Sequence, residues 1–252
     1  REAAARYGVP CHDTRRDMPR EAGQSPDSFE EVARRARYAF LLETASARGC
    51  QALATGHHAD DQAETVLLRL LRGTSPGGLG AIPPVRQCDG VRIIRPLLDC
   101  TRDEILAYLE ARNVPYREDR TNADTRHPRN RVRHELLPLL TRDYNPRVRD
   151  ALRRVAEIQH DEDDFLEGLA ADLAEACRTG EHVIDRGAFA LMHPALQRRV
   201  VALLGWEFGI ECPADRIEAI RRHLLEGATG KACDLGEGIL LRNGRGVTEI
   251  IE

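Results

Sequence analysis

The sequence predicts an α/β fold, in which a parallel sheet with flanking helices is followed by a small α+β C-terminal domain. Through the first half of the chain, short apolar stretches alternate with amphipathic stretches, which is the rhythm of a parallel sheet covered by helices. From His182 onward a short strand, two helices and a terminal pair of strands are expected instead. The 252 residues suffice for one large domain or two small ones.

Residues 1–7 are expected to form the last turns of a helix that ends at Gly8. Ser28 with Glu31, and Thr101 with Glu104, have the spacing of capping boxes at helix starts. The expected strands cover residues 9–15, 51–55 and 91–98, and the expected helices cover residues 28–48, 59–72 and 101–113.

A basic segment opens the second half, because 12 arginines and 6 acidic residues lie between Arg112 and Arg154, a net of +6. It is followed by a helical stretch, residues 157–175, with 8 acidic residues and no arginine or lysine. This pattern is typical of a solvated face or a connector between domains. Further on, the expected helices are 194–208 and 213–226, and the expected strands are 233–241 and 246–251. We therefore divide the chain into a domain at 1–145, a helical connector at 146–178 and a second domain at 179–252.

The composition excludes several classes of protein. The net charge is −4, so the chain is not a simple polycationic nucleic-acid binder, and this charge does not exclude a local basic face. Lys231 is the only lysine, which excludes a Gly-Lys-Ser/Thr phosphate loop. The seven cysteines form no Cys-x-x-Cys pair, and no stretch is long and apolar enough to span a membrane. These features predict a cytoplasmic protein without a membrane partner.

The densest group of chemically active side chains lies where the strand 51–55 meets the helix 59–72. It includes His57, His58, Asp60, Asp61 and Glu64. Ligands of open parallel sheets bind at the carboxyl ends of strands, and a helix start there adds unpaired N–H groups. Acidic residues in a first turn are also ordinary helix starts, and a dinuclear metal site is a further interpretation. All three stay open at this point.

Two basic elements accompany this group. Arg129 and Arg133 share one helix face and form a fork for phosphate, and Asn130 and His134 share another. A solvated basic helix start is the alternative. Arg37 lies near the apolar edge of the helix 28–48, where it suits pairing with a carboxylate or a snorkelling surface position.

In this order, the elements resemble the tRNA(Ile)-lysidine synthetase family of N-type ATP pyrophosphatases. The resemblance covers about residues 27–142, with a weaker likeness in the tail from His182. The matching motifs are Glu30-Glu31-Val-Ala-Arg34-x-x-Arg37-Tyr38, Ala54-Thr-Gly-His-His-Ala-Asp-Asp-Gln-Ala-Glu-Thr65, Leu67-Leu68-Arg69-Leu70-Leu71-Arg72-Gly73, Ile94-Arg95-Pro96-Leu97, Glu118-Asp119-x-Thr121-Asn122 and Arg129-Asn130-x-x-Arg133-His134.

The resemblance implies a Rossmann-like first domain and a tRNA-binding second domain. It implies a ligase that uses ATP and Mg²⁺ to adenylate the wobble cytidine of the isoleucine tRNA with anticodon CAU. Free L-lysine then displaces AMP, giving lysidine and changing codon reading from AUG to AUA. A homodimer is compatible with the resemblance.

The family also has a Ser-Gly-Gly-x-Asp-Ser loop after its first strand, and this sequence has none, since Gly77-Gly78 follows a helix. We therefore expect the chain to begin after that strand and loop, and to be inactive by itself. A non-catalytic tRNA-binding protein and another tRNA-modifying PP-loop ATPase are the alternatives. The latter ranks lower because its sulfur-transferring members commonly use paired cysteines.

The resemblance assigns roles to individual residues. Asp61 is the expected catalytic carboxylate, holding lysine or the metal-bound reaction centre, with Arg37 as its neighbour. The expected nucleotide-binding residues are His57, His58 and Arg133. The expected tRNA-binding residues are Arg129, Asn130, His134, Arg142 and Arg147, and the metal ligands are unknown.

Overall fold

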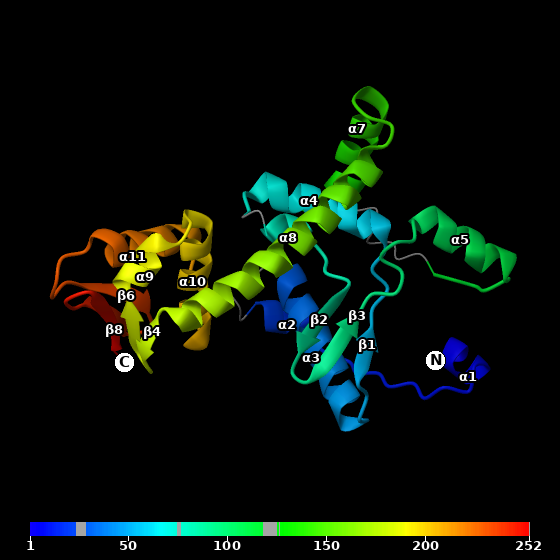
Figure 1. The fold of residues 1–252 in the computed structure, drawn as a ribbon. Helices are drawn as coiled ribbons and strands as arrows, with labels where there is room; N and C mark the ends of the chain where they lie inside the picture. Colours follow the sequence, from blue (N-terminus) through cyan, green and yellow to red (C-terminus); the bar gives the residue numbers. More distant parts are fainter. Residues whose placement is uncertain (24–28, 75–76, 118–124, 126, 252) are drawn as a thin grey trace. The chain divides into compact units, whose positions relative to one another are not determined.

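The computed structural model describes residues 1–23, 29–74, 77–117, 125 and 127–251 (Figure 1). It divides into two compact units, residues 1–157 and 158–252. The division falls within the long helix α8 (Val148–Ala176), in the stretch that the sequence analysis assigned to the connector. The functional assignment of the three expected parts stays a prediction. Among the described residues, no helix is both long and apolar enough to cross a membrane.

Unit 1 contains a small mixed sheet, and helices precede and follow its strands along the chain. Its strands are β1 (Ala52–Ala54), β2 (Val85–Cys88) and β3 (Val91–Ile94). Its helical elements, apart from the start of α8, are α1 (Glu2–Arg6), α2 (Met18–Ala22), α3 (Phe29–Ala47), α4 (Ala59–Arg72), η1 (Gly77–Gly80), α5 (Arg102–Ala111), α6 (Pro128–Arg131), the π-helical turn η3 (Val132–Leu136) and α7 (Leu137–Asp143).

The sheet of unit 1 has the strand order β1-β3-β2. β1 and β3 are parallel, with Leu53 opposite Ile93, and β2 is antiparallel to β3. Asp89 and Gly90 connect β2 to β3 with φ values of 49° and 78°. Two successive positive φ values are the signature of a tight hairpin turn, for which Asp-Gly is a preferred pair. The α/β fold class is therefore confirmed, with an antiparallel edge strand that the sequence analysis missed.

Several expected local features are also confirmed. α4 covers the expected residues and ends at Gly73, whose φ of 75° suits glycine. The side chains of Thr101 and Glu104 form the expected capping box of α5. The strand expected at 9–15 is wrong, because these residues form neither strand nor helix and are exposed without a neighbouring strand. The capping box expected at Ser28 lies outside the described residues.

The core of unit 1 forms along the inner side of α4. Val66 packs with Ala81 and Ala156, and Leu67 packs with Val132 and Leu137. Gln62, only 5% exposed, fixes the chain between η1 and β2, because its amide oxygen accepts from the Ile82 N–H at 2.8 Å. The amide nitrogen of Gln62 donates to the Ile82 carbonyl at 3.1 Å. α4 is thus anchored on one side by apolar packing and on another by this pair of hydrogen bonds.

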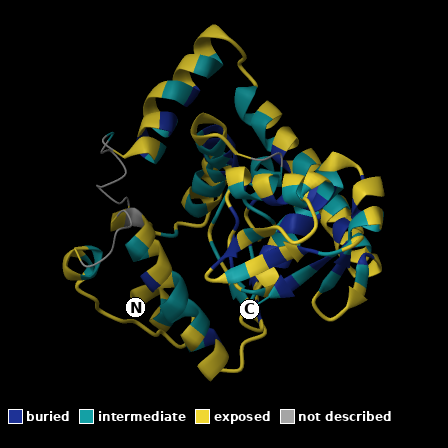
Figure 2. Ribbon diagram, turned by 90° about the vertical axis from the view of Figure 1, so that its left-hand side faces the viewer, coloured by how far each residue is buried: buried dark blue, intermediate teal, exposed yellow. Residues whose placement is uncertain are grey.

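Unit 2 contains an antiparallel sheet in the order β4-β5-β8-β7-β6 and three helices besides the rest of α8. Its core residues include the fully buried Phe189, Ile220 and Leu241. Buried and exposed residues alternate along the helices, as Figure 2 shows. The strands are β4 (Arg178–Gly180), β5 (Val183–Asp185), β6 (Ala232–Gly236), β7 (Ile239–Asn243) and β8 (Val247–Ile251), and the helices are α9 (Arg186–Leu191), α10 (Pro194–Glu207) and α11 (Ala214–Glu226).

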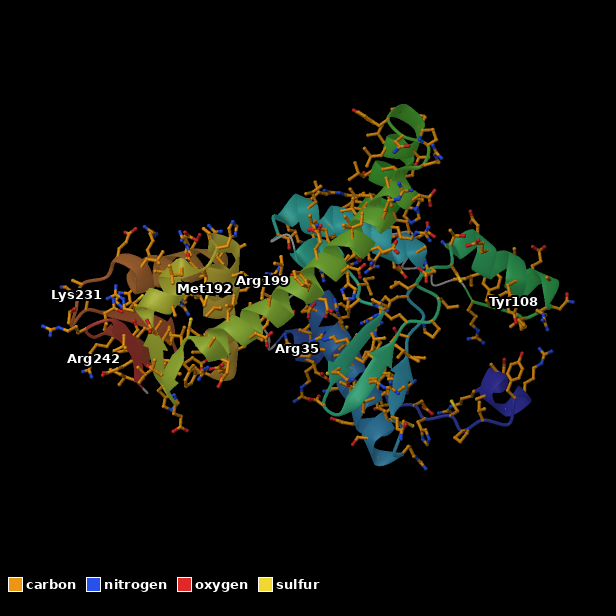
Figure 3. The ribbon with its side chains drawn as sticks, viewed as in Figure 1. Arg35, Tyr108, Met192, Arg199, Lys231 and Arg242 are labelled. Atoms are coloured by element: carbon orange, nitrogen blue, oxygen red, sulfur yellow. The ribbon has the colours of Figure 1, made fainter. Side chains whose placement is uncertain are left out.

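The single strand expected at 233–241 is two strands. Glu237 and Gly238, with φ values of 51° and 90°, turn the chain between β6 and β7. Two consecutive residues at positive φ reverse the chain direction, so one extended strand is impossible there. The only lysine, Lys231, lies in the loop before β6, and Arg242 lies on β7 (Figure 3).

Candidate active site

The candidate site lies where β1 ends and α4 begins. The parallel pairing continues past β1, because the Thr55 N–H donates to the Ile94 carbonyl at 2.9 Å. His58 then precedes the first residue of α4 in extended conformation, and its N–H donates to Asp61 Oδ2 at 3.1 Å. This bond satisfies one donor outside the helix, so the first turn of α4 is fixed at the carboxyl edge of the parallel pair.

Asp60 holds this helix start to two other helices of unit 1. One of its carboxylate oxygens accepts from the backbone N–H of Arg102, the first residue of α5, at 2.8 Å. The other pairs with Arg149 on α8 at 2.7 Å. The Ala59 N–H donates to the Cys100 carbonyl at 2.8 Å. The position of α4 is therefore set by contacts with chain segments that follow much later in the sequence.

His57 lies half-buried beside this turn. Its Nδ1 is 2.9 Å from the Thr55 hydroxyl, so the ring orientation is defined. Burial lowers the pKa of His57, and the arginines Arg95, Arg129 and Arg34 lower it further against the opposing effect of Asp61. The imidazole is consequently neutral near pH 7, which suits a proton acceptor.

Glu64 is the most buried charged residue of the group, with 0% exposure. Two guanidinium groups neutralise it. Arg133 donates to both of its carboxylate oxygens, at 2.5 Å from Nε and 2.9 Å from Nη2. Arg129 adds a third bond from Nε at 3.0 Å. A buried carboxylate is stable only with such pairing, and Glu64 in turn raises the pKa of Arg133.

Asp61 shares the same two arginines but is more accessible, with 13% of its side chain exposed. Arg129 Nη2 lies at 3.0 Å and Arg133 Nη2 at 3.3 Å from Asp61 Oδ1. Asp61, Glu64, Arg129 and Arg133 form what we call the ion-paired cluster. The two carboxylates lie on α4, Arg129 lies on α6 and Arg133 on η3, so each carboxylate is 65 to 72 residues away from the arginines that it pairs with.

The structure brings together some of the sequence-predicted site residues. His57, His58, Asp61, Arg129 and Arg133 all gather at the start of α4. Arg37 does not join them among the described residues: it is exposed on α3, and neither a hydrogen bond nor an ion pair connects it to Asp61. Arg129 and Arg133 are the arginines bonded to Asp61 among the described residues, and the expected role of Arg37 as a neighbour of Asp61 stays a prediction.

The expected tRNA-binding residues have different environments. Arg142 and Arg147 are exposed, and Arg142 pairs with the adjacent Asp143 at 2.5 Å. His134 is exposed as well. Asn130 is buried with 9% exposure, which argues against a direct contact with RNA. The motif Glu118-Asp119-x-Thr121-Asn122 lies outside the described residues.

The sequence analysis assigned no role to three residues of the site, Asp60, Glu64 and Arg149. A signal for Glu64 was present, because it is three residues after Asp61 and four residues before Leu68, at the edge of the buried stripe of α4. No group of three potential metal-binding side chains is assembled in the part of the chain that the structure describes. Asp60, Asp61 and Glu64 face arginines instead, which does not support the dinuclear metal interpretation.

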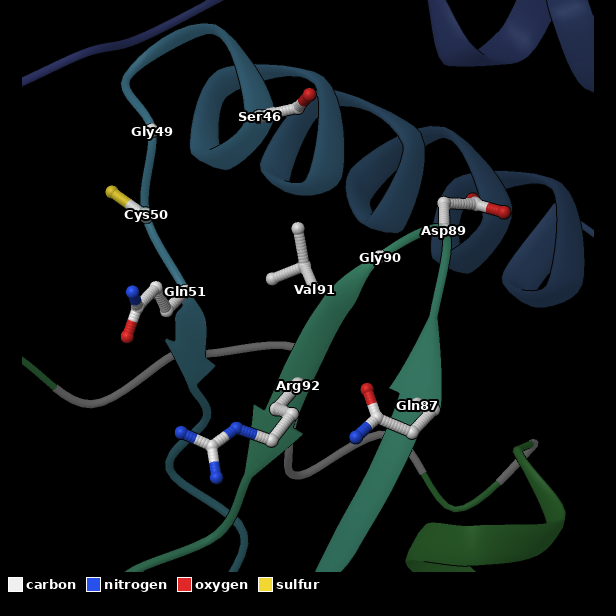
Figure 4. A pocket seen from close by; sticks show the side chains of 9 residues that line it. All are labelled: Ser46, Gly49, Cys50, Gln51, Gln87, Asp89, Gly90, Val91 and Arg92. Atoms are coloured by element: carbon white, nitrogen blue, oxygen red, sulfur yellow. The ribbon is translucent and has the colours of Figure 1, made fainter.

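A separate hollow of about 520 Å³ lies at the opposite, amino edge of the sheet (Figure 4). Cys50 and Gln51, just before β1, and Gly90 and Val91, at the start of β3, contribute to its lining. None of the sequence-predicted site residues lines it. The hollow is therefore not part of the candidate site.

Comparison with known proteins gives a consistent match. Residues 1–140 match the family model described as a PP-loop domain. A tRNA(Ile)-lysidine synthase of Symbiobacterium thermophilum is 40% identical over 235 residues, covering 88% of this chain and 49% of the relative. Proteins of the same name from Geobacter sulfurreducens and Gloeobacter violaceus are each 38% identical, covering 85% and 77% of this chain and 46% and 58% of the relative, respectively. The chain thus spans about half the length of the curated relatives that it matches.

Proposed function

Because the chain belongs to the PP-loop domain family, we propose that it carries part of the active site of a tRNA(Ile)-lysidine synthetase. In the proposed reaction, ATP adenylates the C2 oxygen of the wobble cytidine in the isoleucine tRNA with anticodon CAU. The side-chain amine of free L-lysine displaces AMP, and diphosphate and AMP are the other products. The names of the relatives and their similarity over most of this chain support the proposal.

The observation that carries the proposal is the ion-paired cluster at the carboxyl edge of β1 and β3. Asp61 is the accessible carboxylate of the cluster and is the one we assign to the amino group of lysine. Glu64 is fully buried and is held by two arginines, so it positions them. The neutral imidazole of His57 is suited to accept the proton that the lysine ammonium must lose before it attacks.

Three arginines are proposed to contact phosphate groups of the adenylate or of the tRNA. Arg133 uses Nε and Nη2 on carboxylates, and we propose that Nη1 faces the phosphate of the adenylate. Arg142 and Arg147, both exposed, are proposed to contact the tRNA backbone. We propose that Mg²⁺ enters with the phosphates of ATP, which bind this ion, and we assign it no protein ligand. A cytoplasmic location and a homodimer stay predictions.

The test uses the complete product of the gene that encodes this chain. Radiolabelled lysine, ATP and a transcript of the isoleucine tRNA with anticodon CAU are mixed, and the label in the RNA is counted. Incorporation should require ATP, and a transcript with uridine in place of the wobble cytidine is the matched control. RNA binding without incorporation would favour a non-catalytic tRNA-binding protein. In a parallel reaction with a radiolabelled sulfur donor in place of lysine, incorporation of sulfur would favour another tRNA-modifying ATPase of the family.

A further inference from the structure

The helical run from Pro128 to Asp143 changes its hydrogen-bond register in the middle. The N–H of Leu137 donates to the carbonyl of Val132, which is five residues back rather than four. The backbone stays helical at both ends of this turn, with φ and ψ of −58° and −45° at Val132 and −60° and −43° at Leu137. η3 therefore places one extra residue in a single turn without breaking the run.

Pro138, the second residue of α7, provides the physical reason. Proline has no N–H, so it cannot donate to the carbonyl of His134, four residues back, and in an α-helix its ring collides with that carbonyl. A wider turn ahead of the proline moves the His134 carbonyl away from the proline ring. Such single π-turns are a recognised cause of kinks in helices. The sequence thus disfavours the α register at this point.

The register determines which side chains share a face. Val132, with 4% exposure, and the fully buried Leu137 belong to the same apolar cluster as Leu67. In a regular α-helix, residues five apart point about 140° away from each other. Arg133, not Val132, would then lie one turn from Leu137, on the same face. The π-turn instead aligns the two apolar residues and leaves Arg133 free to meet Glu64 at 2.5 Å.

We propose that Pro138 is a positioning residue for the ion-paired cluster, because it maintains the π register that keeps Arg133 on Glu64. Pro138 itself is exposed and does not contact the cluster through any described hydrogen bond or ion pair. Its effect on the reaction rests on the proposed function. Its effect on the side chain of Arg133 does not, so the two can be tested separately.

The first test is the solvent exchange of the Nε proton of Arg133, measured by NMR in the complete chain. In the wild type this proton should exchange slowly, since it donates to a fully buried carboxylate. Pro138→Ala restores the missing N–H and lets the α register form, so the proton should exchange faster. Leu139→Ala, at the exposed neighbour, is the matched control and should leave the exchange unchanged. Slow exchange that persists in Pro138→Ala would overturn the proposal.

The second test is a rescue by shortening the helix. Deletion of the exposed Glu135 in the Pro138→Ala background puts Val132 and Leu137 four residues apart, so an α-helix can align them and leave Arg133 in place. The deletion alone should fail, because it leaves proline inside an α-helix.

In the complete gene product, Pro138→Ala should lower kcat/KM for lysine incorporation on the order of a hundredfold, as expected for a small displacement at a reaction centre. The double variant should recover both the rate and the slow exchange of Arg133. A double variant no better than Pro138→Ala would contradict the positioning role. If the exchange pattern holds but the wild type incorporates no lysine, the proposed function fails and the positioning role of Pro138 stands.

Discussion

Replacing Glu64 by glutamine tests how strongly the ion-paired cluster stabilises unit 1. The carboxylate is fully buried and accepts three hydrogen bonds from Arg129 and Arg133. Two of the three bonds end on Oε2 and one on Oε1, so the single acceptor oxygen of glutamine keeps one or two of them, and its N–H₂ group faces a guanidinium in either orientation. Each bond to a charged group contributes roughly 1.5–3 kcal/mol. The expected loss in the free energy of unfolding is therefore about 1.5–3 kcal/mol for one lost bond, and it rises towards the ~3–5 kcal/mol of a broken buried ion pair because both guanidiniums also lose their counter-charge.

The loss is measured by urea unfolding of the complete chain, followed by circular dichroism. Trp206 is the only tryptophan and lies in unit 2, so its fluorescence reports that unit separately. Glu64→Gln should shift the transition seen by circular dichroism but not the one seen by fluorescence. Asp61→Asn is the matched control: its side chain is partly exposed, and we expect a loss of about 1 kcal/mol.

A double variant shows whether the loss comes from the pairing itself. Glu64→Gln combined with Arg133→Gln should cost at least about 1 kcal/mol less than the two single losses added together, because the first change has already broken the pair. A loss below ~0.5 kcal/mol in Glu64→Gln, typical of surface substitutions, would refute the reasoning.

Three further outcomes are expected. Asp61→Asn in the complete gene product should abolish lysine incorporation while shifting the unfolding midpoint only slightly, and near wild-type incorporation would contradict the assigned role. Arg142→Ala and Arg147→Ala should each weaken tRNA binding and reduce the salt dependence of the binding constant by about one phosphate contact, measured by filter binding across a salt series; an unchanged slope would identify a solvated surface. Burial lowers the pKa of His57, so the unfolded chain takes up the proton first and unit 1 loses stability as the pH falls below about 6.5. His57→Gln should reduce that loss, and an identical pH profile would argue against a buried neutral imidazole.

The elements that the sequence predicted well are those with local signals. α4 has a stripe of apolar residues and ends at a glycine, and α5 begins with a capping box, so their bounds could be read from neighbouring residues. The same holds for the group of charged residues at the start of α4. Each of these features depends on contacts within one or two helical turns.

The features that the sequence analysis missed depend on distant contacts or on weak local patterns. The partners of Glu64 are 65 and 69 residues away, and no periodicity links positions so far apart. The face of Arg37 was ambiguous because an arginine at an apolar edge suits both a buried pair and a surface position. β2 begins with Val85 and is otherwise polar or small, so only the Asp-Gly pair after it indicated a strand.

The double hydrogen bond of Gln62 has a consequence for the range of sequences that unit 1 tolerates. The side-chain amide accepts from the N–H of Ile82 and donates to its carbonyl, so it pairs with this residue as the backbone of a neighbouring β-strand would. Glutamate and methionine have comparable length but lack the donor, and asparagine has both groups but is one methylene shorter. Each of these alternatives leaves a backbone group of the partly buried Ile82 without its Gln62 partner, at a cost of about 1 kcal/mol. In a library that varies this position alone, selection for folded protein should therefore favour glutamine, although the position lies in the first turn of α4 and contacts no proposed substrate.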